Sequence, residues 1–476
     1  MLWIALTCPD LPLQVLTRGA SEQKPLAVVE HGPPARILAA STAAQALGVQ
    51  PGERLSAARA LAPEMLLRER DAALEAATLA ELAAWAGRFT PAVSLVAPDA
   101  LLLEVSASLR LFDGLERLLA ALRIGLAELG LVAQVAVAPT PLAAHWLALA
   151  RPEYVLTARA GWQNELDALP LAVVSAGTEV SPATLELLAG IGLHTLGQAR
   201  RLPREGLARR QARAFVRALA LALGELPDPR PRHAPPAQYT ACIPLPVPAA
   251  TVEPLLFVTG RLIAGLAAWL EGQQAACDRF ALLLDHDGTG TTRLDIVSGE
   301  PSRDTARLML LVREHLSVLA LAAPVERVRL HADAPVSHPG HTPDLFGDVG
   351  QVRENVTLLL DRLRARLGDE ALWHPAPWPD HRPERACRKQ PASGSPPKPA
   401  HAAPNRPTWL LEAPKPLVSL HGLRWLAGPE RIESGWWDGE DVRREYFVAR
   451  NREGALWWVF RDLADEGAWY VHGYFG

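Results

Sequence analysis

The stretch VSLVAPDALLLEV, residues 93–105, decides how we interpret the first part of the chain. Two apolar runs, Val93–Val96 and Ala100–Val105, flank the turn signal Pro98-Asp99. Short runs rich in Leu and Val, separated by Pro and Asp, predict the two strands of a β-hairpin. Asp99 would lie at a strand end, where a carboxylate facing a cleft is suited to hold Mg²⁺. A metal site would need further carboxylates at the same place.

Length and composition limit the classes of protein to consider. The chain has 476 residues, which predicts several domains of about 100–200 residues each. Its net charge is −4, so any contact with nucleic acid requires local basic patches. The four cysteines are far apart and form no C-x-x-C pair, which favours reduced thiols over a zinc site or disulfides. We expect no signal peptide and no membrane span.

Strands and helices alternate irregularly around the hairpin. Leu2–Thr7, Leu26–Glu30 and Val132–Val137 have the pattern of buried strands. Helical patterns occupy residues 37–47, 55–61, 71–87, 114–129 and 141–150. This order predicts an α+β fold rather than a doubly wound sheet.

Three segments resemble the Y-family of lesion-bypass DNA polymerases. They are AASTAAQALGVQPG at 39–52, PDALLLEV at 98–105 and the stretch 135–152. They are similar to the family's finger segment, to its palm segment S-L-D-E-A-Y-L-D-V and to its A-G-V-A-P-x-K-x-L-A-K segment. The resemblance implies a right-hand architecture. Residues 1–170 would form the palm, with fingers inserted at about 21–80, residues 171–232 a helical thumb, and residues 238–335 the little finger.

The chain departs from the family where the metal ligands belong. Ala5 and Thr7 stand at the positions of the two acids on the first strand, and Asp99-Ala100 replaces the palm Asp-Glu pair. A two-metal site needs about three clustered carboxylates. The resemblance therefore implies a degenerate site without metal at Ala5, Thr7, Asp99 and Ala100. Asp99 is also readily explained as a turn acid.

Other substrate-contacting positions are altered as well. The family's aromatic gate falls near Asp10, and the finger Tyr and Arg that touch the triphosphate become Thr42 and Gln45. The later Lys falls on Pro141 or His145. These changes agree with a loss of nucleotide transfer.

A glycine pair and a run of arginines predict contact with the DNA backbone. Gly190 and Gly192 resemble half of a helix-hairpin-helix, in which backbone N–H groups grip phosphate. The alternatives without a role in DNA binding are that the glycines end a helix and that the arginines form a solvated helix face. We predict DNA-binding roles for Gly190, Gly192, Arg200, Arg201, Arg209, Arg210 and Arg213.

The segment HTPDLFG at 341–347 resembles the motif by which bacterial proteins bind the sliding clamp. Leu345 and Phe346 would be the apolar anchors, with His341 and Asp344 beside them. The alternative is a loop that packs both apolar side chains on its own core.

The segment 336–407 is predicted to be a linker that carries this motif and a helix at 352–367, with disorder from Pro375 to Pro407.

Residues 408–476 contain seven of the fourteen Trp and predict a small β module. The string GPERIESGWWDGEDVRREYFVARNREGALWWVFRD is similar to the C-terminal region of ImuB proteins, a catalytically degenerate Y-family branch.

The resemblance implies a polymerase-shaped hub that binds DNA without extending it, in damage-induced translesion synthesis and mutagenesis. The implied partners are DNA, the sliding clamp, an ImuA or RecA-like protein and a C-family error-prone polymerase, in the cytoplasm at the nucleoid. No cofactor is expected. The alternative is an active translesion polymerase that uses Asp10 and Asp99 with Mg²⁺.

Overall fold

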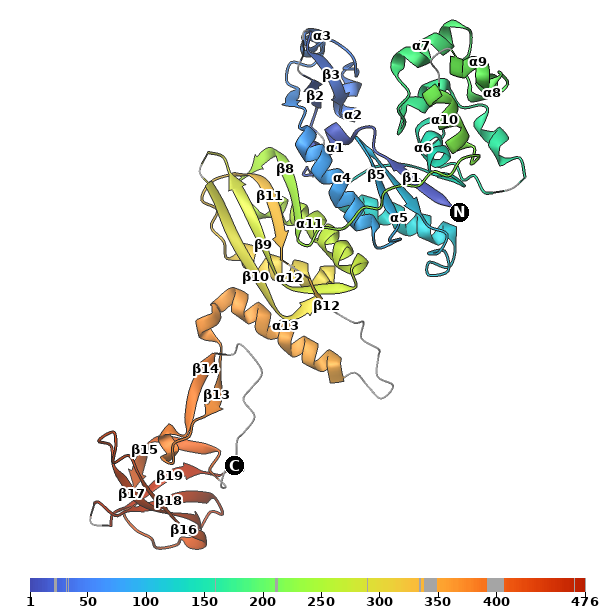
Figure 1. Ribbon diagram of the computed structural model, residues 1–476. Coiled ribbons are helices and arrows are strands. Elements are labelled where there is room, and N and C mark those ends of the chain that lie inside the picture. Colours follow the sequence, from blue (N-terminus) through green and yellow to red (C-terminus); the bar gives the residue numbers. More distant parts are fainter. Residues whose placement is uncertain are drawn as a thin grey trace. The chain divides into compact units, whose positions relative to one another are not determined.

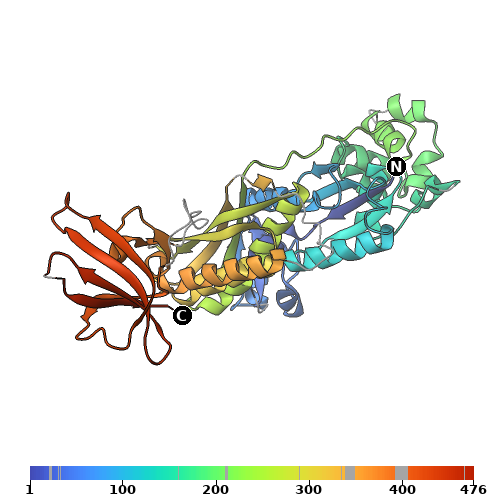
Figure 2. The ribbon, with the colours of Figure 1, turned by 90° about the horizontal axis from the view of Figure 1, so that it is seen from below.

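The structure is a computed structural model of residues 1–476, and it describes all of them except 21–23, 31, 33, 159, 210–212, 289, 334, 338–348, 392–405, 466 and 476. The described residues form two compact units, Met1–Arg362 and Leu363–Gly476. Figures 1 and 2 show the ribbon in two views. Each unit has its own sheets and its own buried core.

The predicted hairpin is confirmed. Strands β5 (Val93–Val96) and β6 (Ala100–Glu104) are antiparallel, with Val96 opposite Ala100. They belong to a four-stranded antiparallel sheet of order β5-β6-β1-β7, in which β1 is Trp3–Thr7 and β7 is Gln134–Ala138. We call it the palm-like sheet. Because successive side chains of a strand point to opposite faces, β1 contributes to two separate cores.

Helices bury both faces of the palm-like sheet. The helices are α1 (Leu11–Thr17), α4 (Ala72–Ala86), α5 (Leu115–Leu129) and α6 (Pro141–Ala150). Ile4 and Leu6 share a core with α1, α4 and α5, whereas Ala5 shares one with α6. The Trp85 ring of α4 packs against α5 at Gly125, where a Cβ would lie 2.6 Å from the ring.

In the finger-like insertion, the helix predicted for residues 37–47 is wrong in its first half. Residues 37–47 form strand β3 (Arg36–Ala40) and the short helix α2 (Thr42–Ala46). Ser41 separates them, because its hydroxyl accepts from the Ala44 N–H and caps the helix. Strand β3 pairs with β2 (Leu26–Glu30), which also pairs with β4 (Leu66–Glu69), and α3 (Leu55–Leu61) covers them. The pairing with β2 overrides the helical pattern of 37–40.

Short helices follow α6 and complete its core. They are η1 (Trp162–Leu166), η2 (Leu171–Ser175), α7 (Pro182–Gly190), α8 (Leu196–Arg200), α9 (Arg204–Arg209) and α10 (Arg213–Ala222). Leu188, Leu196 and Phe215 are buried in the same core as Ala5. This helical part therefore packs on the Ala5 face of the palm-like sheet.

The next part has the order strand, helix, two strands, helix and strand. Its elements are β8 (Tyr239–Ala249), α11 (Val252–Gly272), β9 (Ala275–His286), β10 (Gly290–Ser302), α12 (Thr305–Ser317), β11 (Val325–Ala332) and β12 (Val336–Ser337). The main strands follow the order β10-β9-β11-β8, and β12 pairs with β9. We call this the little-finger-like sheet.

Helix α11 is the central core helix of the first unit. It packs against β8, β9 and β11 as well as α4 and α5 (Figure 1). Within the described part of the chain it is the one helix long and apolar enough to cross a membrane by length and composition alone. Leu255, Leu262 and Trp269 on it are fully buried in the protein core.

Helix α13 (Val349–Leu367) is anchored near its end, where Asp361 accepts from the Gly299 N–H at 3.0 and 2.9 Å.

The disorder predicted from Pro375 is wrong for the described residues up to 391. Strands β13 (Trp373–Pro377) and β14 (Cys387–Pro391) form a hairpin after η3 (Asp369–Ala371). The Lys389 ammonium lies 4.5 Å from the Trp373 ring centroid, so aromatic contacts override the Pro- and Lys-rich composition.

The predicted C-terminal β module is confirmed. Its strands, β15 (Trp409–Pro416), β16 (Arg424–Ser434), β17 (Val442–Arg450), β18 (Leu456–Asp462) and β19 (Trp469–Tyr474), have the order β15-β19-β18-β17-β16. Tyr446 stacks on Trp458 in its core at 4.0 Å. Arg382, next to η4 (Pro383–Arg385), is buried and pairs with Asp380 and Asp438, which links the hairpin to the β16–β17 turn.

Candidate functional site

The degenerate positions lie together on two neighbouring strands. Thr7 on β1 is opposite Ala100 on β6, and Ala5 is opposite Leu102. Ala5, Thr7 and Ala100 have no exposed surface. Ala5 and Ala100 are part of the apolar core under α6, and the Thr7 hydroxyl has no hydrogen-bond partner among the described residues. Apolar packing therefore occupies the place at which the family resemblance puts acids.

Asp99 is the one carboxylate among the four positions, and it is half-buried. Its carbonyl accepts from the Cys8 N–H at 2.8 Å. Burial raises the pKa of the Asp99 carboxyl, and its backbone hydrogen bond opposes this only in part. Burial, followed by the charge of Asp99, raises the pKa of the Cys8 thiol to about 12. Burial therefore disfavours the charged form of Asp99.

These residues do not fit two Mg²⁺ ions. Such a site requires about three carboxylates around ions roughly 3.5–4 Å apart. The described residues contain no group of three or more His, Cys, Asp or Glu that would hold a metal. Asp10 adds a second acid, but it is exposed at the start of α1 and cannot supply the third. We derive no metal-dependent step from this site.

His145 stands at one of the two positions matched to the family's Lys, and it is buried on α6. Burial, followed by the charge of Arg230, lowers the pKa of His145 to about 4. A Cβ at Gly177 would lie 2.9 Å from His145 Nδ1, so this turn packs directly against the ring. The side chain is neutral near pH 7 and provides no cation for a triphosphate.

The finger positions are exposed and uncharged. Thr42 is the first residue of α2, and the Gln45 amide donates to the Ala40 carbonyl at 2.8 Å. The substitution at Gln45 therefore replaces a cation by a side chain used within the finger-like part.

Gly190 and Gly192 lie at an exposed turn. Gly190 ends α7, and Gly192 has φ +87°, where glycine is favoured. A Cβ at either residue would meet nothing within 4 Å. The next helix, α8, is capped by Thr195 and Gln198 through a reciprocal capping box. This geometry accounts for both glycines as helix-end residues, and a phosphate grip by them stays a prediction.

The predicted arginines have different surroundings. Arg200 pairs with Asp167 at 3.1 Å and donates to Asn164 Oδ1 at 2.7 Å, so it supports the local fold. Arg201 is exposed and has no ion pair among the described residues. Arg209 lies in α9, and Arg210 lies outside the described residues. Their contact with DNA stays a prediction.

Arg213 and Arg217 are the clearest candidates for phosphate contact. Both are exposed on α10, four residues apart, and neither has an ion pair within the described part of the chain. Like charges at this spacing lie on one helix face and destabilise an isolated helix by about 0.2–0.5 kcal/mol. Such a pair is suited to contact with an anionic partner, and this contact stays a prediction.

The little-finger-like sheet has a second basic surface, which is not among the residues predicted from the sequence. Its inner face packs on α11 and α12, whereas the other face carries Arg279, Arg293, Arg327 and Arg329. Arg329 pairs with Asp285 at 2.6 Å and Arg293 with Asp295 at 2.8 Å. The alternation of charged and apolar residues in β10 and β11 is the signal that would have revealed this face.

The clamp motif lies outside the described residues. His341, Asp344, Leu345 and Phe346 all fall within 338–348. Their role therefore stays a prediction from the sequence.

Comparison with known proteins agrees with the motifs. Residues 14–148 match the impB/mucB/samB family. The protein ImuB from two strains of Caulobacter vibrioides is 28% identical over 464 residues, covering 90% of this chain and 100% of ImuB. The chain is ImuB-like. DNA polymerase IV 2 of Mesorhizobium japonicum is 27% identical over 379 residues, covering 71% of this chain and 85% of that enzyme.

Solved Y-family structures are also similar. DinB from Sulfolobus solfataricus has a TM-score of 0.38 and 18% identity, and an insertion ternary complex of Dbh DNA polymerase has a TM-score of 0.40 and 17% identity. Each comparison covers 71% of this chain and 100% of the other. The ImuB-like prediction rests on the sequence matches, and the predicted α+β multidomain fold with a C-terminal β module is confirmed by the described elements.

Proposed function

We propose that this ImuB-like chain is a non-catalytic, polymerase-shaped hub in damage-induced translesion synthesis and mutagenesis. The observation that carries the proposal is the burial of Ala5, Thr7 and Ala100 in a packed interior. Loss of metal ligands removes several kcal/mol of charge stabilisation from a phosphoryl transfer, and each ~1.4 kcal/mol is a factor of ten in rate.

DNA binding is the retained activity. The support is the exposed pair Arg213 and Arg217 and the basic outer face of the little-finger-like sheet. Both surfaces act on the phosphate backbone, which makes binding independent of sequence and sensitive to salt.

The hub recruits the polymerase that performs synthesis. Leu345 and Phe346 bind the sliding clamp, and other surfaces bind an ImuA or RecA-like protein and a C-family error-prone polymerase, in the cytoplasm at the nucleoid. The likeness to ImuB over 90% of the chain supports this assignment. The deciding experiment is primer extension together with a gel shift on primed DNA, for which we expect binding without extension.

A further inference from the structure

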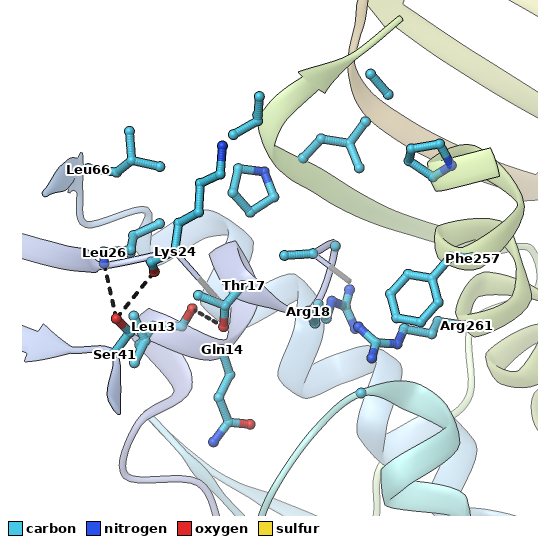
Figure 3. A pocket seen from close by; sticks show the side chains of 18 of the residues that line it. Leu13, Gln14, Thr17, Arg18, Lys24, Leu26, Ser41, Leu66, Phe257 and Arg261 are labelled. Atoms are coloured by element: carbon cyan, nitrogen blue, oxygen red, sulfur yellow. Dashed lines mark hydrogen bonds between the residues drawn. The ribbon is translucent and has the colours of Figure 1, made fainter. Parts of the chain in front are cut away.

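A cavity of about 530 Å³ opens between the palm-like, finger-like and little-finger-like parts of the first unit. This volume falls within the usual range of small-molecule sites, roughly 300–1,000 Å³. Its walls come from α1, the start of β2, the end of β8 and one side of α11 (Figure 3). None of the degenerate positions Ala5, Thr7, Asp99 and Ala100 lines it, whereas Asp10 and Thr42, which match the family's gate and finger positions, do.

Three cations line this cavity: Arg18, Lys24 and Arg261. Figure 3 shows Arg18 beside Arg261, with Lys24 on the finger side. Asp10 is the one acid in the lining. Because Glu81 neutralises Arg18 at 2.9 Å, Lys24 and Arg261 exceed the one acid of the lining by a single positive charge, which an anion would balance.

Arg261 is the cation best placed to bind an anion in this cavity. Among the described residues its guanidinium has no ion pair or hydrogen bond, and it lies over the Phe257 ring at 4.3 Å. A Cβ at Gly130 would lie 2.4 Å from the Arg261 guanidinium carbon, so the guanidinium packs directly against that backbone. Burial, followed by the charge of Arg18, lowers the pKa of Arg261. A partly buried, unpaired cation beside another cation is unfavourable without a ligand.

Arg18 is held in the wall of the cavity by partners within the chain. It is 3% exposed, and its Nη2 donates to Glu81 and to the Cys242 carbonyl, each at 2.9 Å. Its Nε has no acceptor among the described residues. Because this Nε has almost no accessible surface, it does not face the cavity, and Arg18 acts as a fixed part of the wall beside Arg261.

The remaining wall is apolar. Leu13, Leu26, Leu66, Val132, Val247 and Pro254 are among the lining residues. Such a wall suits a hydrophobic or flat aromatic group rather than a hydrated ion.

We propose that this cavity binds a small organic anion, in which a phosphate or carboxylate is attached to an apolar or aromatic body. The anionic group pairs with Arg261 and Lys24, because guanidinium and ammonium groups bind phosphate and carboxylate oxygens. The body lies against the apolar wall between α1 and β8.

The test is calorimetric titration of the full chain with two probes, AMP and dodecanoate. We expect one-to-one binding of at least one probe. AMP binding would assign an aromatic phosphate, and dodecanoate binding an acyl carboxylate. Arg261→Gln and, independently, Lys24→Gln should each weaken binding about tenfold or more. Val247→Trp, which fills the cavity and keeps every cation, should also weaken it.

The matched control is Arg59→Gln, because Arg59 is exposed on α3 and does not line the cavity. Its binding should equal that of the unmodified chain. Circular dichroism verifies that each variant is folded. If Arg261→Gln does not fold, the Lys24→Gln variant, at an exposed residue, provides the test. The proposal is overturned if neither probe binds at millimolar concentration, if inorganic phosphate binds as well as both, or if folded charge and Val247→Trp variants bind unchanged.

Discussion

Arg18 donates to Glu81 at 2.9 Å, and both side chains are almost fully buried. The Tyr239 hydroxyl donates to the same carboxylate at 3.3 Å. This triad connects α1, α4 and β8, which lie far apart in the sequence. It therefore joins the palm-like helices to the little-finger-like sheet inside the first unit.

Breaking the buried pair should destabilise the chain strongly. Glu81→Gln leaves the Arg18 charge buried without a partner, which costs about 3–5 kcal/mol of unfolding free energy. The double variant Arg18→Met/Glu81→Leu should recover much of that loss, because it removes both charges. Urea unfolding monitored by Trp fluorescence measures both.

The control is the exposed pair of Arg117 and Asp113. Asp113→Asn should change the unfolding free energy by less than about 1 kcal/mol. Equal effects at Glu81 and Asp113 would show that the buried triad does not hold the two parts together.

Local pattern was sufficient for the palm-like sheet, because strands β5 and β6 are short apolar runs with a turn between them. It failed at residues 37–40, where pairing with β2 overrides a helical pattern. The loss of acids at Ala5 and Ala100 was readable from the motif. The cavity lined by Arg18, Lys24 and Arg261 could not be predicted from the sequence, because packing between distant segments brings its residues together.

The C-terminal unit should lose stability in acid through His472. Burial lowers the pKa of His472 to about 4, and its Nδ1 lies 2.8 Å from the Tyr446 hydroxyl. The folded pKa is below the usual 6.5, so the unfolded chain binds more protons as the pH falls between these values. The stability from neutral His472 is present above pH 6.5 and is lost toward pH 4, by up to roughly 3 kcal/mol.

Trp fluorescence melts of the full chain at several pH values test this, because Trp458 stacks on His472. In His472→Gln the acid shift of the transition that reports the C-terminal unit should be smaller than in the unmodified chain. His421→Gln, at an exposed histidine, should keep the full shift. An undiminished acid shift in His472→Gln would contradict the assignment.

Arg213 and Arg217 should carry part of the salt dependence of DNA binding. Each phosphate contact contributes about −0.9 to the slope of log K against log salt. Replacing both by Gln should flatten the slope by up to about 1.8, independent of DNA sequence. Fluorescence anisotropy with duplexes of two sequences measures it.

Arg313→Gln is the matched control, because Arg313 is exposed on α12 in another part of the unit. Its slope should stay unchanged. If the double variant also keeps its slope, the DNA surface lies elsewhere on the chain.

Leu345→Ala with Phe346→Ala should remove most of the sliding-clamp binding. Two apolar anchors dominate short motifs of this kind, and burying each contributes about 1.5–3 kcal/mol. Calorimetry against the clamp and thermal melting separate the possibilities. Intact clamp binding would refute the contact, and a melt lowered by several degrees would assign both residues to the core.

The central claim is that this polymerase-shaped chain does not transfer nucleotides, and primer extension tests it most directly. Purified protein is incubated with primed template, nucleotides and Mg²⁺ or Mn²⁺, while a gel shift verifies that the DNA is bound. We predict bound DNA and no added nucleotide, for the unmodified chain and for Asp99→Ala alike. Extension by the unmodified chain that disappears in Asp99→Ala or Asp10→Ala would contradict the account.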